Sequence, residues 1–440
     1  MNQNVNNYSF IIQEERIEIL EEIFHGKNHI LKGILHPKEI NICKSCSSTK
    51  VISFGRKVKN IKFDILSDVD TTLILTYHKF KCKDCGKLFC DTSSICLKNQ
   101  NISLSLKLKV LEDLRHDVSF TYIANMRGIS VQSVIDIFES LINYDRVPFG
   151  DVLCVDEFKN LKSSVGKYAF LMFDPNSHKV LDVLPDRHLE TIDNYLYKID
   201  WKEKDKVKYF ITDMNESYRS VKKKHFPNAT HIVDTFHFCR YVEDAWNDVR
   251  IRVQATFGQH TKEYKILKNN WKILSAYSID VEGENFYNPI RKKYTSVETL
   301  IDDAINIHED LYAAHVLITL FLKGLREVKF EDSLTWIENW ITELKDTSIK
   351  EFKDLADMFQ NWKIEIRNSF IRFGDKRLHN GYIEGINNKI KELKRIAYGY
   401  ANFTHFRNRI MHCINGNYSI KQVDRTKIKR HTRNKKDNKY

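Results

Sequence analysis

The sequence has no apolar run long enough to span a bilayer, and its polar start, MNQNVNNYSF, lacks the charged and then apolar segments of a secretion signal. It also has no Gly-rich phosphate-binding loop and no internal repeat. The lack of a long apolar run excludes a membrane-spanning protein. Because the sequence has no Gly-rich phosphate-binding loop, nothing in it indicates a requirement for ATP. We therefore expect a cytoplasmic protein with no membrane partner.

Charge and composition favour a globular protein with a polyanionic partner. The 440 residues are enough for two or three domains, and a hydrophobic fraction of 42% supplies their cores. The net charge is +12, but residues 421–440 alone hold nine Lys or Arg against two Asp or Glu. This basic tail is typical of a disordered, soluble end or of an arm that binds nucleic acid without sequence preference.

Nine cysteines in a chain without a secretion signal favour free thiols or metal ligands over disulfides. Two CxxC pairs, in CKSC and CKDCG, enclose a stretch that contains the strand-like DTTLILTYHKFKC. The four residues of these pairs are Cys43, Cys46, Cys82 and Cys85. Four thiolates in two tight pairs suit tetrahedral coordination, so the pattern predicts a structural Zn²⁺ in a zinc ribbon over residues 41–98. A redox CxxC is the rival interpretation, and Cys90 or Cys96 could replace one ligand.

The stretch SFTYIANMRGISVQSVIDIFESL, residues 119–141, is typical of two helices joined by a sharp turn. Gly128 permits the turn, and Ser130 is placed to cap the second helix. We interpret the stretch as a DNA-binding helix-turn-helix whose second helix exposes Gln132 and Ser133. A plain helical hairpin in a bundle is the alternative.

After residue 148 the pattern changes to strands and helices of an α/β domain. DVLCVDEF, KYAFLMF and VLDVLP read as an antiparallel meander, and a helix from about residue 188 to 199 follows. VKYFITDM and THIVDTF read as two further strands, each followed by a helix. The order βββαβαβα is that of an α/β catalytic core with the ribonuclease-H-like fold. In that fold the first and fourth strands are neighbours, so Asp156 and Asp213 would converge at the strand ends.

A third carboxylate, Glu384, lies in the stretch NGYIEGINNKIKELKRIAYGY. Apolar residues at three- and four-residue steps give this stretch the core-facing side of a helix. Glu384 falls on the opposite side with Asn388, Lys391 and Arg395, a set that suits a phosphate backbone. An ordinary solvated helix side with salt bridges has the same pattern. Three carboxylates from these elements can hold two Mg²⁺ ions that clamp a phosphodiester.

Four segments resemble the DDE transposases of bacterial insertion sequences: VLCVDEF, FITDM, DTFHFCRY and NGYIEGINNKIKELKRIAYGYANFTHFRNRI. With the cysteine pairs and the helix-turn-helix upstream, the chain is most similar to the ISL3 family. The resemblance implies a DNA strand-transferase that uses Mg²⁺ or Mn²⁺, with Asp156, Asp213 and Glu384 as its catalytic triad. The resemblance also implies that two or more copies of the chain bind double-stranded DNA, both the terminal inverted repeats and the target DNA. A protein that binds this DNA would be associated with the nucleoid.

The same resemblance implies a domain organisation with a helical insertion before the glutamate. The expected segments are a helical 1–40, a zinc ribbon at 41–98, a helix-turn-helix at 99–147, a catalytic domain at 148–420 with its insertion at about 251–375, and a disordered tail at 421–440. The helical segment is expected because residues 9–25 look helical. The insertion carries four tryptophans, expected to lie mostly in its core: Trp271, Trp336, Trp340 and Trp362.

The sequence leaves three alternatives open. Asp234 and His237 match an Asp-x-x-His element of related transposases, but a helix cap and a core histidine would give the same residues. The whole chain could be a DNA-binding repressor that has lost catalysis. It could also be a structure-selective nuclease on the ribonuclease-H-like fold.

Overall fold

A computed structural model shows two compact units. The amino-terminal unit is Met1–Asp145 together with Ile390–Tyr440, and the central unit is Arg146–Lys389. The described residues are 12, 14–38, 42–64, 69–97, 99–274, 286–288, 292–373, 376–378, 380–396, 402–416 and 419–420. The basic tail expected at 421–440 lies outside them.

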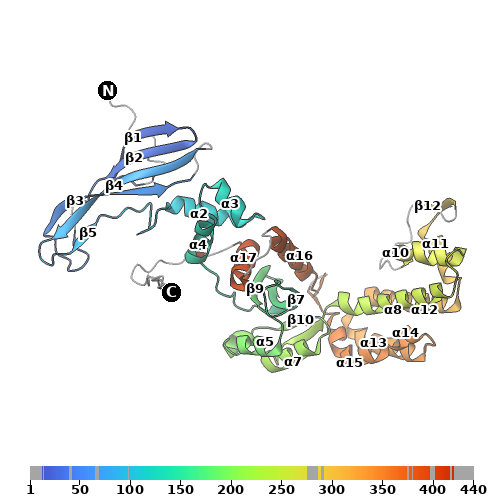
Figure 1. Cartoon of the computed structure of the whole chain (residues 1–440). Helices are drawn as coiled ribbons and strands as arrows, with labels where there is room; N and C mark the ends of the chain where they lie inside the picture. Colours follow the sequence, from blue (N-terminus) through green and yellow to red (C-terminus); the bar gives the residue numbers. More distant parts are fainter. Residues whose placement is uncertain are drawn as a thin grey trace, which may run out of the picture. The chain divides into compact units, whose positions relative to one another are not determined.

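A five-stranded sheet forms the first part of the amino-terminal unit (Figure 1, blue). Its strands are β1 (Ile17–His25), β2 (Asn28–Leu35), β3 (Val51–Lys62), β4 (Asp70–Cys82) and β5 (Leu88–Cys90). The order is β1-β2-β4-β3, with β5 also paired to β4. Strand β4 runs parallel to β2 and antiparallel to β3 and β5.

The expectation of a helix over residues 9–25 is wrong for the described part of that stretch, because Ile17–His25 is strand β1. His25 pairs with Asn28, so only Gly26 and Lys27 connect β1 to β2. Gly26 has a φ of +59°, which glycine adopts without strain in a two-residue hairpin turn. This turn lets β1 fold back on β2 and pair along its length, which a helix would prevent.

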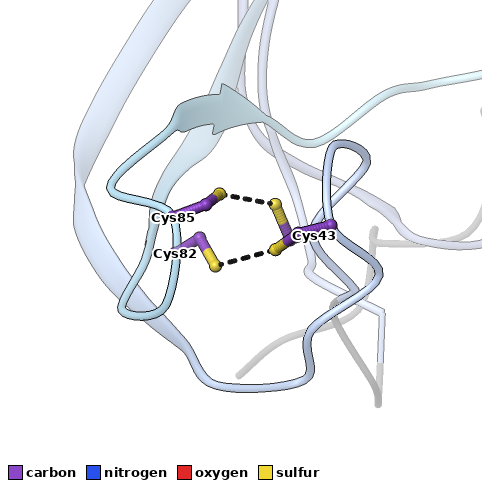
Figure 2. A group of neighbouring side chains, drawn as sticks. Cys43, Cys82 and Cys85 are labelled. Carbon is purple, nitrogen blue, oxygen red and sulfur yellow. Dashed lines mark hydrogen bonds between the residues drawn. The ribbon is translucent and has the colours of Figure 1, made fainter.

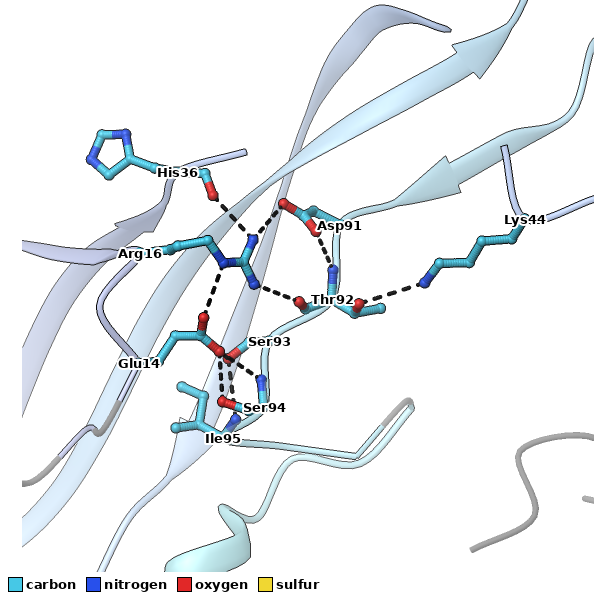
Figure 3. Close-up of polar contacts among 9 residues, drawn as sticks. All are labelled: Glu14, Arg16, His36, Lys44, Asp91, Thr92, Ser93, Ser94 and Ile95. Atoms are coloured by element: carbon cyan, nitrogen blue, oxygen red, sulfur yellow. Dashed lines mark hydrogen bonds and ion pairs between the residues drawn. The ribbon is translucent and has the colours of Figure 1, made fainter. Parts of the chain in front are cut away.

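Polar contacts around Arg16 join the start of β1 to the segment after β5 (Figure 3). The Arg16 guanidinium donates to Asp91 Oδ2 at 3.0 Å and to the Thr92 carbonyl at 2.9 Å. Beside it, Glu14 Oε2 accepts from the backbone N–H of Ser94 at 2.8 Å. Residues 14–35 therefore belong to the same sheet domain as the cysteine pairs, and the expected boundary at residue 40 does not separate two domains.

Three short helices complete the first stretch of this unit: α2 (Leu104–Asp113), α3 (Phe120–Met126) and α4 (Val131–Leu141). The Ser130 hydroxyl caps α4 by accepting from the N–H of Ser133. Gly128, in the turn between α3 and α4, has a φ of +60°, and a Cβ on it would lie 2.4 Å from Asp70 Oδ1. The turn therefore requires glycine both for its backbone and for its close approach to β4.

Helix α17 (Phe403–Asn415) belongs to the amino-terminal unit. Arg409 of α17 is buried and donates to the carbonyls of His116 and Val118, both at 2.9 Å. His412 Nε2 contacts the Leu111 carbonyl at 2.8 Å. Because α17 packs on the α2–α4 helices in this way, the catalytic domain expected over 148–420 does not continue as one compact unit to residue 420.

The central unit contains the expected α/β sheet. Its strands are β7 (Val152–Lys159), β8 (Tyr168–Asp174), β9 (Lys179–Leu184), β10 (Tyr209–Thr212) and β11 (Thr230–Val233), in the order β11-β10-β7-β8-β9. Strands β7, β8 and β9 form an antiparallel meander, and β10 pairs in parallel with both β7 and β11. Helices α5 (Leu189–Leu196) and α6 (Trp201–Lys204) precede β10, and α7 (Glu216–His225) and α8 (Thr235–Ala255) follow β10 and β11. The first and fourth strands are neighbours, as the ribonuclease-H-like pattern predicts.

A mainly helical insertion follows α8 and returns to the sheet through α16 (Gly381–Ile396). Its helices are α9 (Lys262–Asn269), α10 (Trp271–Leu274), α11 (Val297–Ile305), α12 (Glu309–Glu327), α13 (Phe330–Asp346), α14 (Lys350–Lys353) and α15 (Ala356–Asn368), and its short strands are β12 (Phe286–Asn288), β13 (Lys293–Thr295), β14 (Arg372–Phe373) and β15 (Lys376–Arg377). Trp340 and Trp362 lie in its core, and Trp271 is exposed. Trp336 packs directly on Gly324, where no Cβ would fit. No helix in the described ranges has both the length and the apolarity that crossing a membrane requires.

Candidate metal centres

The two CxxC pairs meet in one cluster of the amino-terminal unit. Ligand atoms of Cys43, Cys46, Cys82 and Cys85 all lie within 4.8 Å of one another. Cys43 Sγ is 3.5 Å from Cys85 Sγ (Figure 2). Cys46 Sγ is 3.6 Å from Cys82 Sγ. The sequence pattern thus predicted correctly which four of the nine cysteines converge.

Each CxxC pair lies on a turn, and the two turns have the same hydrogen-bond pattern. The N–H of Ser47 donates to the Cys43 carbonyl at 2.9 Å, and the N–H of Gly86 donates to the Cys82 carbonyl at 3.0 Å. Ser47 and Gly86 have φ values of +56° and +70°. Each turn points its two thiols to the same side, because the chain reverses directly after the second cysteine.

The local electrostatics favour the thiolate, the form that binds metal, at Cys43 and Cys82. At Cys46 the backbone N–H of Ser48 lowers the pKa, but the hydrogen bond with the Cys85 thiol and burial outweigh it and raise the pKa. The backbone N–H groups of Ser45 and Cys46 lower the pKa of the Cys43 thiol to about 6. The N–H of Cys85 is the main cause of a lowered pKa at Cys82. Four sulfurs that can approach a tetrahedron are the ligand set of structural zinc, so the cluster is compatible with a Zn²⁺ ion.

Cys90 and Cys96 are not part of this cluster. Cys90 lies on β5, opposite Lys79 of β4. The Cys96 thiol is buried and donates to the carbonyl of Gln100 at 2.6 Å. Neither replaces one of the four ligands in the described structure.

A second centre lies where β7 and β10 run side by side. Ile211 pairs with Cys154 in a parallel register, and the same register continued for two residues sets Asp213 beside Asp156. Both side chains are half-buried. The two aspartates therefore converge because of strand pairing.

Burial at this position raises the pKa of both carboxyl groups. Burial, with the nearby Asp213 as the second cause, raises the pKa of Asp156 to about 7. Burial also raises the pKa of Asp213, while His237 on α8 acts in the opposite direction on both. Asp213 Oδ1 is buried and has no hydrogen-bond donor. Such an oxygen, next to a second carboxylate, is a suitable ligand for a divalent cation such as Mg²⁺.

One side of helix α16 contacts the region around the two aspartates. Asn387 Nδ2 donates to Asp156 Oδ2 at 2.8 Å, and the backbone N–H of Asn380, just before the helix, donates to Asp234 Oδ1 at 3.2 Å. Glu384 is four residues after Asn380 and three before Asn387, so it lies on the same side. Its side chain is exposed. Within the described residues, the carboxylate oxygens of Asp156, Asp213 and Glu384 do not all approach to within 4.8 Å of one another.

Three other polar residues surround the aspartates. Asp234 occupies the N-cap position of α8 but makes no side-chain cap, because its carboxylate accepts from Asn380 instead. His237, one turn later, is half-buried and is not a core histidine. Glu157 accepts from the Tyr218 hydroxyl at 3.0 Å and pairs with Arg187, which supports a structural role.

The expected DNA-binding residues lie on two helices. Gln132 of α4 is exposed and donates to Asp136, and the Ser133 hydroxyl contacts Ser130. On α16 the expected exposed set is present: Asn388, Lys391 and Arg395. The sequence pattern missed Asn387, whose signal was its position one turn after Glu384.

Comparison with known proteins gives the class. Residues 153–410, more than half of the chain, match the model of the ISL3 transposases. This class is that of the DDE transposases, and the chain belongs to their ISL3 family.

A relative supports the same assignment. The chain is similar to the transposase for insertion sequence element IS1001 from Bordetella parapertussis, with 24% identity over 275 residues. The match covers 61% of this chain and 62% of the relative, which is less than two thirds of either.

The cysteine cluster gives the first prediction. Cys82→Ser should remove one equivalent of zinc and unfold the metal-binding end of the sheet, because three ligands no longer close the site. Zinc content of the purified chain, measured by elemental analysis, checks this, with Cys90→Ser as the matched control that keeps its metal. Equal zinc in the Cys82 and Cys90 variants would exclude the cluster as a zinc site.

The aspartate pair gives a prediction about pH in the presence of EDTA. A pKa raised from 3.8 to about 7 means that Asp156 contributes stability below pH 4 and that this contribution is lost as the pH rises to about 7. Asp156→Asn should therefore melt at a higher temperature than the wild type at pH 8 but not at pH 4. The difference is on the order of a few kcal/mol, since one pKa unit is about 1.4 kcal/mol. Thermal melts at both pH values test this, and Asp244→Asn, at an exposed site on α8, is the control that should follow the wild type.

Proposed function

We propose that this transposase binds the terminal inverted repeats of an insertion sequence, cleaves DNA at the element's ends and joins the ends to target DNA. Asp156, Asp213 and Glu384 are the proposed catalytic triad. The observation that carries the proposal is the parallel register of β7 and β10, which brings two carboxylates together beneath the stripe of α16 that bears Glu384. The printed name of the relative from Bordetella parapertussis agrees with this activity.

The oxygen atoms available as ligands around Asp156 and Asp213 suit Mg²⁺ or Mn²⁺. The buried polar atoms without a partner on Asp213, Asn380 and Asn387 are all oxygens, the ligand type that these hard cations prefer. When bound there, the metal would supply Lewis-acid stabilisation of the phosphodiester and activation of the attacking hydroxyl. The side chains of the triad would hold this metal. Two reactions are proposed: water first hydrolyses one DNA strand, and the freed 3′ hydroxyl then attacks target DNA. Both are displacements at phosphorus, so one site can serve both.

DNA recognition is assigned to the amino-terminal unit. Helices α3 and α4, with their glycine turn and serine cap, are proposed to act as a helix-turn-helix, and the cysteine cluster is proposed to hold a structural Zn²⁺ in the adjoining sheet. The exposed Lys391 and Arg395 of α16 suit contacts with phosphates. Two or more copies are proposed to hold the two ends of the element, and nothing in the chain indicates ATP.

Charge-removing substitutions in the triad test the catalytic part. Glu384→Gln, Asp156→Asn and Asp213→Asn each keep the shape of the side chain and should leave DNA binding intact while strand cleavage falls by 10²-fold or more, since each removes a ligand charge. Cleavage of a plasmid that carries the element's ends, with Mg²⁺ and with EDTA, measures this.

The control is Glu392→Gln, the same change at an exposed position two turns further along α16. It should cleave like the wild type. Normal cleavage by the Glu384 variant would mean that Glu384 belongs only to a solvated helix side. A wild type that binds the repeats but cuts no DNA would instead indicate a repressor, and cleavage without regard to the repeats would indicate a nuclease.

A second pair of variants tests how recognition is divided. Gln132→Ala should reduce the preference for the terminal repeats by about 1–3 kcal/mol, the usual value of a lost base contact. Deletion of residues 421–440 should weaken binding to all DNA alike and reduce its salt dependence, because phosphate contacts carry no sequence information. Competition binding with repeat and random DNA at several salt concentrations separates the two effects. A tail deletion that selectively lost the repeats would contradict this division.

A further inference from the structure

Two asparagines, seven residues apart, attach α16 to the central sheet. Asn380 donates from its backbone to Asp234 and from Nδ2 to the Val155 carbonyl, at 3.2 and 3.5 Å. Asn387 donates from Nδ2 to Asp156 Oδ2 at 2.8 Å. A spacing of seven returns to the same side of a helix, so the two contacts hold one stripe of α16 against the end of β7.

We infer that Asn387 is a positioning residue, which fixes the Asp156 carboxylate and the Glu384-bearing turn of α16 relative to each other. The inference rests on the proposed function, because it concerns the proposed metal centre. Asp156 Oδ1 accepts from the N–H of Glu157 at 2.7 Å, and Oδ2 accepts from Asn387. With one donor on each oxygen, the carboxylate plane of Asp156 cannot rotate freely.

The chemistry of the contact requires an amide at position 387. A carboxylate there would face Asp156 with a like charge, and an alkyl side chain would offer no donor. For the ionised Asp156 the amide orientation is also determined, because the reversed amide would place two acceptor oxygens 2.8 Å apart. Asn387 therefore directs its N–H₂ group to Asp156 and leaves its buried Oδ1 unpaired.

The position of Asn387 in the helix explains how it acts. Glu384 is exposed and lies one turn before Asn387, and its side chain makes no hydrogen bond to either aspartate in the described structure. The Asn387 contact is thus a direct side-chain link from α16 to the aspartate pair. Groups that orient the ligands of a metal in this way typically change metal affinity by about 10–100-fold when they are removed.

The test uses the full-length chain without DNA, so that it does not depend on catalysis. Asn387→Ala should reduce Mn²⁺ affinity about 10–100-fold by isothermal titration calorimetry while the melting temperature in EDTA stays close to that of the wild type. Alanine favours the helix, so loss of α16 itself is not expected. The matched control is Asn269→Ala, at an exposed asparagine on α9.

A second variant keeps the shape and reverses the polarity. In Asn387→Asp the new carboxylate repels the ionised Asp156, so at pH 8 and in EDTA the amides of residues 381–388 should exchange hydrogen faster than in the wild type, and Asn269→Asp should show no such change. Unchanged exchange in Asn387→Asp, or unchanged Mn²⁺ affinity in Asn387→Ala, would overturn the inference alone. A wild type that binds no Mn²⁺ would overturn the proposed function as well, so the two failures are distinguishable.

Discussion

The parallel pairing of β10 with β7 is the constraint on which the proposed centre depends. It sets Asp213 beside Asp156 in a partly buried position, where burial opposes the ionisation of both carboxyl groups and Asp213 also opposes that of Asp156. The sheet holds these charges because its backbone pairing and the apolar residues behind the strands are far stronger in sum than one repulsive pair. A site that is unfavourable without a cation is well suited to binding one.

The same constraint also explains why α16 presents a neutral amide, and not a cation, to the two aspartates. In the ranges that the structure describes, the cationic influence on both aspartates comes from His237, and no lysine or arginine forms an ion pair with either. A lysine in the place of Asn387 would neutralise the pair and occupy the place of a metal. A neutral amide orients the carboxylate and leaves its charge available.

The amino-terminal unit follows a different physical principle. Its four clustered cysteines lie on two short turns, and none of them belongs to the apolar core of the sheet. A metal ion is an efficient cross-link at such a place. The buried Arg409 of α17 then connects the carboxyl-terminal helix to this same unit through backbone carbonyls.

The sequence by itself determined the features that depend on local patterns: the two CxxC turns, the order of strands and helices in the central unit, the convergence of Asp156 with Asp213, and the exposed side of α16. Tertiary structure alone decided the others. The isoleucines of residues 17–25 fit a helix as well as a strand, and pairing with β2 selected the strand. Asn387 and Asn388 are adjacent and chemically identical, and only the rotation of α16 on the sheet, fixed by contacts between residues more than 200 positions apart, determines which one reaches Asp156.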